Sequence, residues 1–149
     1  NPKRFDHGSM FYHAGKEGIL DTEHSIQAGL RSYNPKSHGF HTLTAEFVHE
    51  NGIDATVSRI KDIVGDQPAY LTFDIDALDP AFAPGTGTPV WGGLTSHQAA
   101  VMLRDLAGIN MIGGDVVEVS PPFDTSGATA IAAAHVATEL LCLWGWARR

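Results

Sequence analysis

Two aspartates separated by one residue follow an apolar segment near the middle of the chain. Asp74 and Asp76 come directly after residues 69–73 (AYLTF), which have the pattern of a buried β-strand. Side chains two residues apart in an extended segment point to the same side, so the two carboxylates can converge on one point. Two carboxylates without a countercharge repel each other, and a divalent cation removes that conflict. The pair is therefore a candidate metal-binding site.

Other roles are open for this aspartate pair. Aspartates often cap turns and helix ends. A phosphotransferase with an aspartyl nucleophile would carry a hydroxyl residue soon after the second aspartate, whereas Ala77 and Leu78 follow Asp76. A sugar-nucleotide transferase would carry a nucleotide-binding region, and no glycine-rich phosphate loop opens a helix in this sequence. Both transferase classes are weakened, and the metal-binding and capping roles stay open.

Glu118 and His7 are two further candidates for chemistry. Glu118 lies where an apolar segment ends before Pro121. Its carboxylate could bind a planar cation through two parallel hydrogen bonds, although most glutamates are simply surface residues. His7 precedes the first regular element and could carry a proton or contact a substrate, because histidine titrates near neutral pH. The chain has eight histidines, so an ordinary polar role is the alternative for His7.

The elements that must position these residues alternate between strands and helices. The predicted strands are 25–30, 40–43, 69–74 and 109–119, and the predicted helices are 53–64, 95–106 and 128–146. Thr95 and Gln98 form a capping box at the start of the second helix. Strand 69–74 has apolar residues on both faces, which predicts a parallel strand covered by helices on both sides. In such an α/β fold the acidic clusters fall at the carboxyl ends of strands, where ligands bind.

The composition is that of one globular domain. The chain has 149 residues, of which 43% are hydrophobic, and a net charge of −7 with no charge block. We therefore expect neither nucleic acid nor membrane as a partner, and a small cationic substrate suits the charge. The most apolar region, 128–147, is interrupted by His135, Thr138 and Glu139, so no uninterrupted run reaches the roughly 20 residues of a membrane span. Cys142, the only cysteine, is expected to pack in the core, which fits a reducing cytoplasm.

Taken together, the segments resemble the ureohydrolase family of arginases and agmatinases, and are most similar to bacterial agmatinases. The matching segments are 6–11 (DHGSMF), 28–31 (AGLR), 70–80 (YLTFDIDALDP), 81–95 (AFAPGTGTPVWGGLT) and 115–121 (DVVEVSP). They occur in family order and cover nearly the whole chain. The resemblance implies a three-layer α/β/α fold with a mainly parallel sheet, of which residues 1–149 form the carboxyl-terminal part of a single domain.

The resemblance also implies a reaction and roles for individual residues. Asp74 and Asp76 match metal ligands, Glu118 matches the glutamate that holds the guanidinium, and His7 matches a catalytic histidine beside the substrate. Thr86 lies in the matching loop near the metals. The implied reaction is hydrolysis of agmatine to putrescine and urea by a hydroxide that bridges two Mn²⁺ ions, a step of polyamine biosynthesis. Carboxylate ligands suit manganese. A cytoplasmic homo-oligomer is implied for the full-length protein.

Two departures from the family pattern matter. The family's other metal ligands lie in Gly-Gly-Asp-His and Asp-Ala-His-x-Asp segments, which are absent here and are expected upstream of Asn1. We therefore expect the isolated chain to be inactive, and a non-catalytic relic or a stand-alone metal-binding module stays an alternative. Arginases place acidic residues after Gly-Leu-Arg, whereas Ser32, Tyr33 and Asn34 follow here. An uncharged segment suits agmatine, with guanidinobutyrate as an alternative substrate.

Overall fold

Strands and helices are interspersed along the chain, with two consecutive strands between the first two helices. The computed structural model describes residues 5–32 and 36–149. The helices are α1 (Met10–Lys16), α2 (Ala45–Val64), α3 (Ser96–Asp105) and α4 (Ala128–Trp146), and the strands are β1 (Ile26–Leu30), β2 (His41–Thr44), β3 (Ala69–Asp74) and β4 (Met111–Val117). Two short 3-10 turns follow β3 and β4, namely η1 (Ile75–Ala77) and η2 (Pro121–Phe123). β3 and α4 have their predicted bounds.

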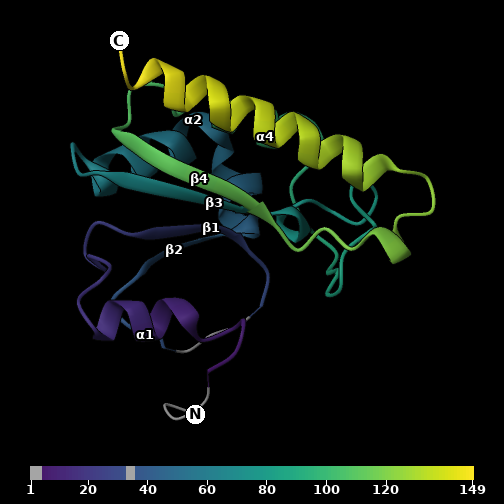
Figure 1. Cartoon of the computed structure of the whole chain (residues 1–149), viewed down its shortest axis with the longest axis horizontal. Helices are drawn as coiled ribbons and strands as arrows, with labels where there is room; N and C mark the ends of the chain where they lie inside the picture. Colours follow the sequence, from purple (N-terminus) through teal and green to yellow (C-terminus); the bar gives the residue numbers. More distant parts are fainter. Residues whose placement is uncertain (1–4, 33–35) are drawn as a thin grey trace.

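The strands form two parallel pairs, β1 with β2 and β3 with β4. α4 packs along β4, α2 packs against β1 and β2, and α3 contacts both α2 and α4. Figure 1 shows α4 running beside β4, with α1 at the opposite end of the view. The α/β class with parallel strands is confirmed. Because parallel strands point the same way, β3 and β4 end together, and Asp74 is paired in register with Val117.

The buried core extends up to the turn that carries the two aspartates. Ile75, Leu78 and Leu94 are 0%, 2% and 1% exposed. An isolated parallel bridge joins Leu78 to Leu94, so the core continues from the end of β3 into the loop before α3. Burial of Ile75 between Asp74 and Asp76 anchors the aspartate turn to the rest of the domain.

Helix α2 begins earlier than predicted. The periodicity of its second half predicts a helix over 53–64, but α2 starts at Ala45, where the Thr44 side chain accepts a hydrogen bond from the Phe47 N–H. Gly52, with φ of 83° and ψ of 173°, breaks the helix into two segments. The left-handed φ is open to glycine because it has no Cβ. The first segment is short and carries little periodic signal, which is why the prediction missed it.

One helix start and one side chain test local predictions directly. The capping box at α3 is confirmed: the Thr95 side chain accepts from the Gln98 N–H at 3.1 Å, and the Gln98 side chain accepts from the Thr95 N–H at 2.9 Å. Cys142, expected in the core, is instead exposed on α4. The apolar run around Cys142 contains residues on every side of a helix, so only some of them can face the core.

By length and composition, α4 could cross a membrane, which differs from the interpretation that polar residues interrupt it. One such helix is weak grounds for a membrane span, because the core helix of a soluble protein passes the same test. Val136, Leu140 and Leu143 of α4 are buried, and the helix packs on β4 and α3.

One face of β3 is uncovered in the part of the chain that the structure describes. Phe73 is buried, whereas Tyr70 is 57% exposed and Thr72 is also exposed. The Tyr70 hydroxyl donates to Asp115 Oδ2 at 2.9 Å on this face, so Asp115 serves as a partner within the sheet. The prediction that helices cover both faces of strand 69–74 is therefore wrong for the described residues. The apolar residues of a strand indicate that its faces require cover, but they do not show which segment supplies that cover.

We expect the isolated chain to self-associate through this uncovered face. Exposed apolar sheet surface is a site of association because burial removes it from water. Sedimentation velocity at roughly 10 to 100 μM should show concentration-dependent species larger than a monomer, a range chosen because weak interfaces associate at such concentrations. Thermal unfolding should lack a sharp transition.

Two charge insertions locate the associating surface. Tyr70→Lys places a charge on the uncovered face and should reduce association. Ile131→Lys, on the exposed side of α4 where Ile131 is 71% exposed, serves as the matched control and should not. The reverse result would place the association on α4, and a wild-type monomer that unfolds sharply would contradict the prediction.

Candidate metal and guanidinium site

The turn after β3 holds Asp74 and Asp76 in a defined arrangement. The Asp74 side chain accepts a hydrogen bond from the Asp76 N–H at 3.0 Å and so caps the η1 turn. This is the capping role that the sequence left open, and it uses only one oxygen of Asp74. Capping and metal binding are therefore compatible at this position, because the described contacts give the second oxygen no hydrogen-bond partner.

A threonine from the following loop holds the second aspartate. Thr88 Oγ1 donates to Asp76 Oδ2 at 2.8 Å. The sequence pointed to Thr86 instead, but Thr86 is 3% exposed, and its hydroxyl has no hydrogen-bond partner among the described contacts. Thr86 forms an antiparallel bridge with Val119 and so ties the loop to the end of β4. Thr86 and Thr88 lie in the same loop, and no local signal in the sequence indicates which of them contacts Asp76.

Asp79 closes the loop that carries Thr88. One Asp79 oxygen accepts from the Ala81 N–H at 3.0 Å, and the other accepts from Gly92 at 2.9 Å and Gly93 at 3.2 Å. These backbone donors, with that of Ala81 the strongest, hold the pKa of Asp79 below its usual value. Asp79 thus ties the start of the loop to its end and is a structural residue.

Glu118 lies directly after β4 with a strained backbone. Its φ is 64°, in the left-handed region that side chains other than those of Asn and Asp rarely enter. Such strain costs roughly 1 kcal/mol or more and is concentrated at functional sites. Glu118 is exposed, and its charge contributes to the raised pKa of Asp74. The structure therefore brings Glu118 near the aspartate turn, as the shared sheet edge predicts.

The group of Asp74, Asp76 and Glu118 is electrostatically suited to a cation. Burial, together with the charges of Asp76 and Glu118, raises the pKa of Asp74 to about 6. The Asp76 N–H and the more distant Arg31 act in the opposite direction. A nearby positive ion would relieve the cost of the ionised carboxylate.

We expect Asp74→Asn to stabilise the metal-free chain at alkaline pH. The folded-state pKa of Asp74 is about 6 against an ordinary 3.8. A raised acid pKa means that the protonated form favours folding below 3.8 and that this contribution is lost as pH rises through about 6. The shift corresponds to about 1 to 2 kcal/mol after discounting for partial exposure. The urea concentration that removes half of the circular dichroism signal should be higher for Asp74→Asn than for wild type at pH 8, and the two values should converge at pH 4.

Asp62→Asn provides the matched control, because Asp62 is exposed on α2. Its stability relative to wild type should not change between pH 4 and pH 8. An Asp74→Asn variant that is less stable than wild type at pH 8 would contradict the assigned direction of the Asp74 pKa.

The residues present fit part of a manganese site. Oxygen donors such as Asp74 and Asp76 suit Mn²⁺, and each carboxylate keeps an oxygen beyond the one engaged by the protein. Across residues 5–32 and 36–149, no three His, Cys, Asp or Glu side chains are grouped to hold a metal ion. The described carboxylate pair could contribute to a metal site but does not make a complete one.

His7 and the segment after Arg31 are the two remaining parts of the predicted site. His7 is exposed in the turn before α1, where Ser9 N–H donates to the Asp6 carbonyl at 3.0 Å. No contact of the described residues joins His7 to the acidic group, so its role stays a prediction. Tyr33 and Asn34, on which the choice of substrate rested, lie outside the described residues.

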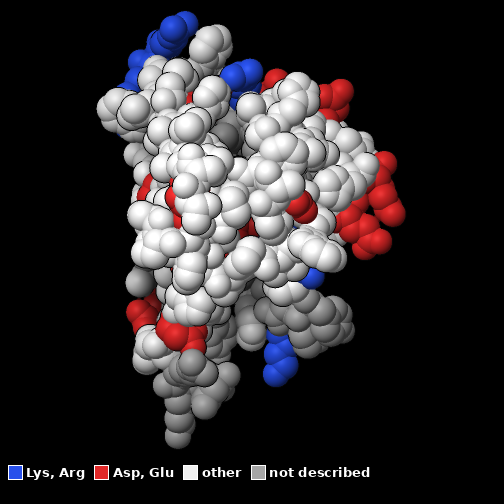
Figure 2. Space-filling view, turned by 90° about the vertical axis from the view of Figure 1, so that its right-hand side faces the viewer, with Lys and Arg blue, Asp and Glu red and all other residues white. Residues whose placement is uncertain are grey.

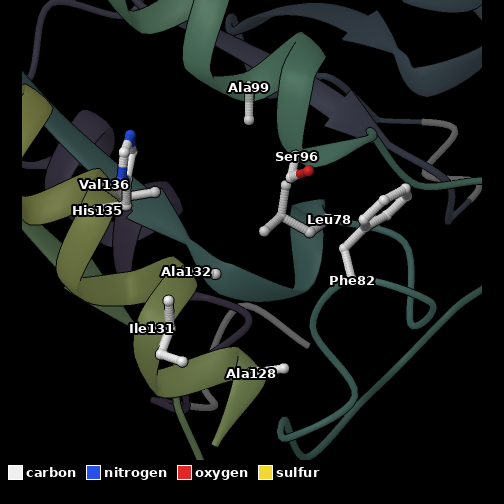
Figure 3. Close-up of a pocket in the computed structure, with 9 residues that line it drawn as sticks. All are labelled: Leu78, Phe82, Ser96, Ala99, Ala128, Ile131, Ala132, His135 and Val136. Atoms are coloured by element: carbon white, nitrogen blue, oxygen red, sulfur yellow. The ribbon is translucent and has the colours of Figure 1, made fainter.

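The site is distinct from the apolar hollow between α3 and α4. That hollow encloses about 360 Å³ and is lined mainly by apolar side chains of Leu78, Phe82, the start of α3 and α4 (Figure 3). None of the three acidic residues lines it, and its apolar walls do not suit a cation. Figure 2 faces the end of the molecule at which β3 and β4 end, and shows acidic side chains spread over a largely uncharged surface.

Several known proteins are similar to this chain in sequence and in fold. The profile of the arginase family matches residues 1–142. An agmatinase from Chromobacterium violaceum is 54% identical over 143 residues, which are 96% of this chain and 44% of that protein. An agmatinase from Escherichia coli is 55% identical over 141 residues, which are 95% of this chain and 46% of that protein.

Solved structures with the same fold as this chain belong to similar proteins. The crystal structure of a hypothetical agmatinase from Burkholderia thailandensis superposes with a TM-score of 0.91 at 60% identity, covering 93% of this chain and 44% of that one. Proclavaminate amidinohydrolase from Streptomyces clavuligerus also gives a TM-score of 0.91, at 39% identity, covering 99% of this chain and 53% of that one. The chain spans about half the length of the relatives it matches. On this match and this shared fold, the chain belongs to the arginase (ureohydrolase) family.

Proposed function

We propose that this chain supplies the carboxyl-terminal part of a ureohydrolase active site that hydrolyses agmatine to putrescine and urea. The observation that best supports the proposal is the position of Asp74, Asp76 and Glu118 where β3 and β4 end. These residues occur in a chain that is 54% identical to a protein named agmatinase.

Asp74 and Asp76 would hold manganese in this proposal. Their carboxylates are kept in place by the Asp76 N–H and by Thr88, and both leave an oxygen for a ligand. When bound, manganese supplies Lewis-acid chemistry that activates water at neutral pH. Two carboxylates are too few for two ions, so further ligands are required from the family segments Gly-Gly-Asp-His and Asp-Ala-His-x-Asp, which this sequence lacks.

Glu118 would bind the guanidinium group of the substrate. A carboxylate matches a guanidinium through two parallel hydrogen bonds, which fix the plane of the trigonal carbon. Because Glu118 follows β4 and Asp74 ends the neighbouring β3, that carbon would lie beside the metal ligands. Orientation of this kind lowers the barrier by replacing a bimolecular encounter with a positioned one. His7 would carry a proton to the departing amine.

A different guanidino substrate is the second candidate. Proclavaminate amidinohydrolase, which is named for another substrate, matches this chain with the same TM-score as the agmatinase structure. The shared fold therefore accommodates more than one guanidino compound. The sequence after Arg31 carries no acidic residue up to position 36, which favours a substrate without an α-amino group, such as agmatine or guanidinobutyrate.

The test is an assay of the protein encoded by the whole gene, which we call the full-length protein. It should release urea from agmatine with manganese present and stop after chelation. Arginine and guanidinobutyrate serve as competing substrates. A second arm joins residues 1–149 to the unmatched part of the C. violaceum agmatinase, which should restore manganese-dependent urea release to an otherwise inactive chain.

The outcomes separate the alternatives. Urea release from guanidinobutyrate alone would reassign the substrate while keeping the ureohydrolase site. A full-length protein that binds no manganese and releases no urea would identify a non-catalytic relic. Tight manganese binding by the isolated chain would favour a stand-alone metal-binding module. The homo-oligomer and the cytoplasmic location remain predictions from the resemblance.

A further inference from the structure

Arg31 links three separate segments of the chain around the aspartate turn. Its side chain donates hydrogen bonds to the backbone carbonyls of Gly29 at 3.0 Å, Val90 at 3.1 Å, and Asp76. Gly29 belongs to β1, Asp76 to η1, and Val90 to the loop that carries Thr88. One guanidinium group therefore joins the end of β1, the aspartate turn and the loop.

The contacts of Arg31 avoid the carboxylates. In the described part of the chain it binds the carbonyl oxygen of Asp76, and no ion pair joins it to Asp74 or Asp76. An ion pair with either carboxylate would occupy the oxygens that a metal ion requires. Arg31 is close enough to favour ionised Asp74 and Asp79 at longer range. It thus supplies positive charge to the acidic group without consuming its ligand atoms.

The N–H, the carbonyl and the carboxylate of Asp76 each form a hydrogen bond with a neighbouring residue. Its N–H donates to Asp74, its carbonyl accepts from Arg31, and its carboxylate accepts from Thr88. These three attachments come from three directions along the chain and define both the peptide planes and the side-chain rotamer. Losing the contact with Arg31 would remove the hydrogen bond that holds the Asp76 carbonyl, and the carboxylate of the same residue would be less tightly positioned.

The Arg31 contacts carry an energetic cost that could be avoided if the residue only held the three segments together. Arg31 Nε is buried without a hydrogen-bond partner among the described contacts. An unpaired buried donor is unfavourable, and an apolar side chain could join the same segments without it. The planar guanidinium offers something an apolar side chain lacks, namely several donors in a rigid fork that reach different carbonyls at once.

We propose that Arg31 is a positioning residue for the metal ligand Asp76 and acts through the carbonyl group of Asp76. The inference rests on the proposed function, because it assumes that Asp76 binds manganese. Arg31 orients the Asp76 carboxylate toward Asp74 and, through Val90, keeps Thr88 in reach of that carboxylate. It touches neither substrate nor metal.

The test uses Arg31→Lys and Arg31→Gln in the full-length protein. Lysine keeps the charge but replaces the planar fork with a compact ammonium group, and glutamine removes the charge. Manganese affinity is measured by the electron paramagnetic resonance signal of free Mn²⁺ during titration. Both variants should bind manganese about 10- to 100-fold more weakly, the usual effect of losing a group that orients a metal ligand. At saturating manganese, kcat for agmatine should fall while KM changes less than about twofold, because Glu118 binds the substrate from another strand.

Matched controls and a double variant sharpen the test. Arg104→Lys and Arg104→Gln alter an exposed arginine that pairs with Glu139 at 2.7 Å, and should leave manganese affinity unchanged. Thr88→Val removes the hydrogen bond to the Asp76 carboxylate. If both residues act through Asp76, the losses of affinity in Arg31→Lys and Thr88→Val should be non-additive when combined.

Several results would overturn the inference. Wild-type manganese affinity in Arg31→Lys would show that charge alone suffices. Unchanged affinity in both Arg31 variants with a lower melting temperature would show a role in the fold only, as would failure of both to fold while the Arg104 variants fold. Additive losses with Thr88→Val would show that Arg31 does not act through Asp76. Wild-type protein that binds manganese but releases no urea from any guanidino compound would refute the proposed function, while the affinity measurements would still test Arg31.

Discussion

Asp74→Asn and Asp76→Asn are each expected to lower the manganese content of the full-length protein and to abolish urea release. A neutral amide cannot supply the negative charge that holds a divalent cation. Loss of about 4 kcal/mol of metal-dependent stabilisation corresponds to a fall of roughly 1,000-fold in kcat. Metal content is measured by elemental analysis after gel filtration, and urea release is measured with saturating agmatine.

The two variants also separate binding from stability. Asp74→Asn should stabilise the metal-free chain at pH 8, because burial raises the Asp74 pKa. A variant that is more stable without metal and inactive with it would identify a side chain kept for binding at the expense of folding. Asp62→Asn, on the exposed side of α2, should change neither quantity. Full manganese content in Asp74→Asn or Asp76→Asn would refute the assignment of that residue as a ligand.

Glu118→Gln is expected to retain manganese and to lose substrate binding. The glutamine amide keeps the shape of the side chain but removes the charge that matches a guanidinium group, and it can accept only one of the two hydrogen bonds. Hydrogen bonds to charged groups contribute about 1.5 to 3 kcal/mol each, so kcat/KM for agmatine should fall roughly 100-fold. Steady-state kinetics and manganese analysis on the same preparation measure both quantities.

Glu50→Gln is the matched control for Glu118→Gln, because Glu50 is exposed on α2. It should have wild-type kinetics and metal content. If Glu118→Gln loses manganese but binds substrate normally, Glu118 is a metal ligand, and the roles proposed for Glu118 and the aspartates must be exchanged.

Elements that carry strong local signals could be predicted from the sequence alone. The largely apolar segment of β3 ends at Asp74, and the Thr95 and Gln98 pair marks the start of α3. Both predictions hold because their causes are local: a run of apolar residues that requires burial, and two side chains that satisfy neighbouring backbone groups. The order of the acidic segments also placed the candidate residues at one sheet edge, since parallel strands end together.

The neighbours that hold the candidate residues are brought to them by contacts between distant parts of the folded chain. Thr88, rather than Thr86, contacts Asp76, and Arg31 reaches the Asp76 carbonyl from 45 positions earlier in the chain. No local pattern encodes such contacts, because they depend on how the loop after β3 folds back over β1. The left-handed backbone of Glu118 likewise could not be predicted from the local sequence. A non-glycine residue adopts it only where the surrounding structure enforces it, and that enforcement exists only in the folded chain.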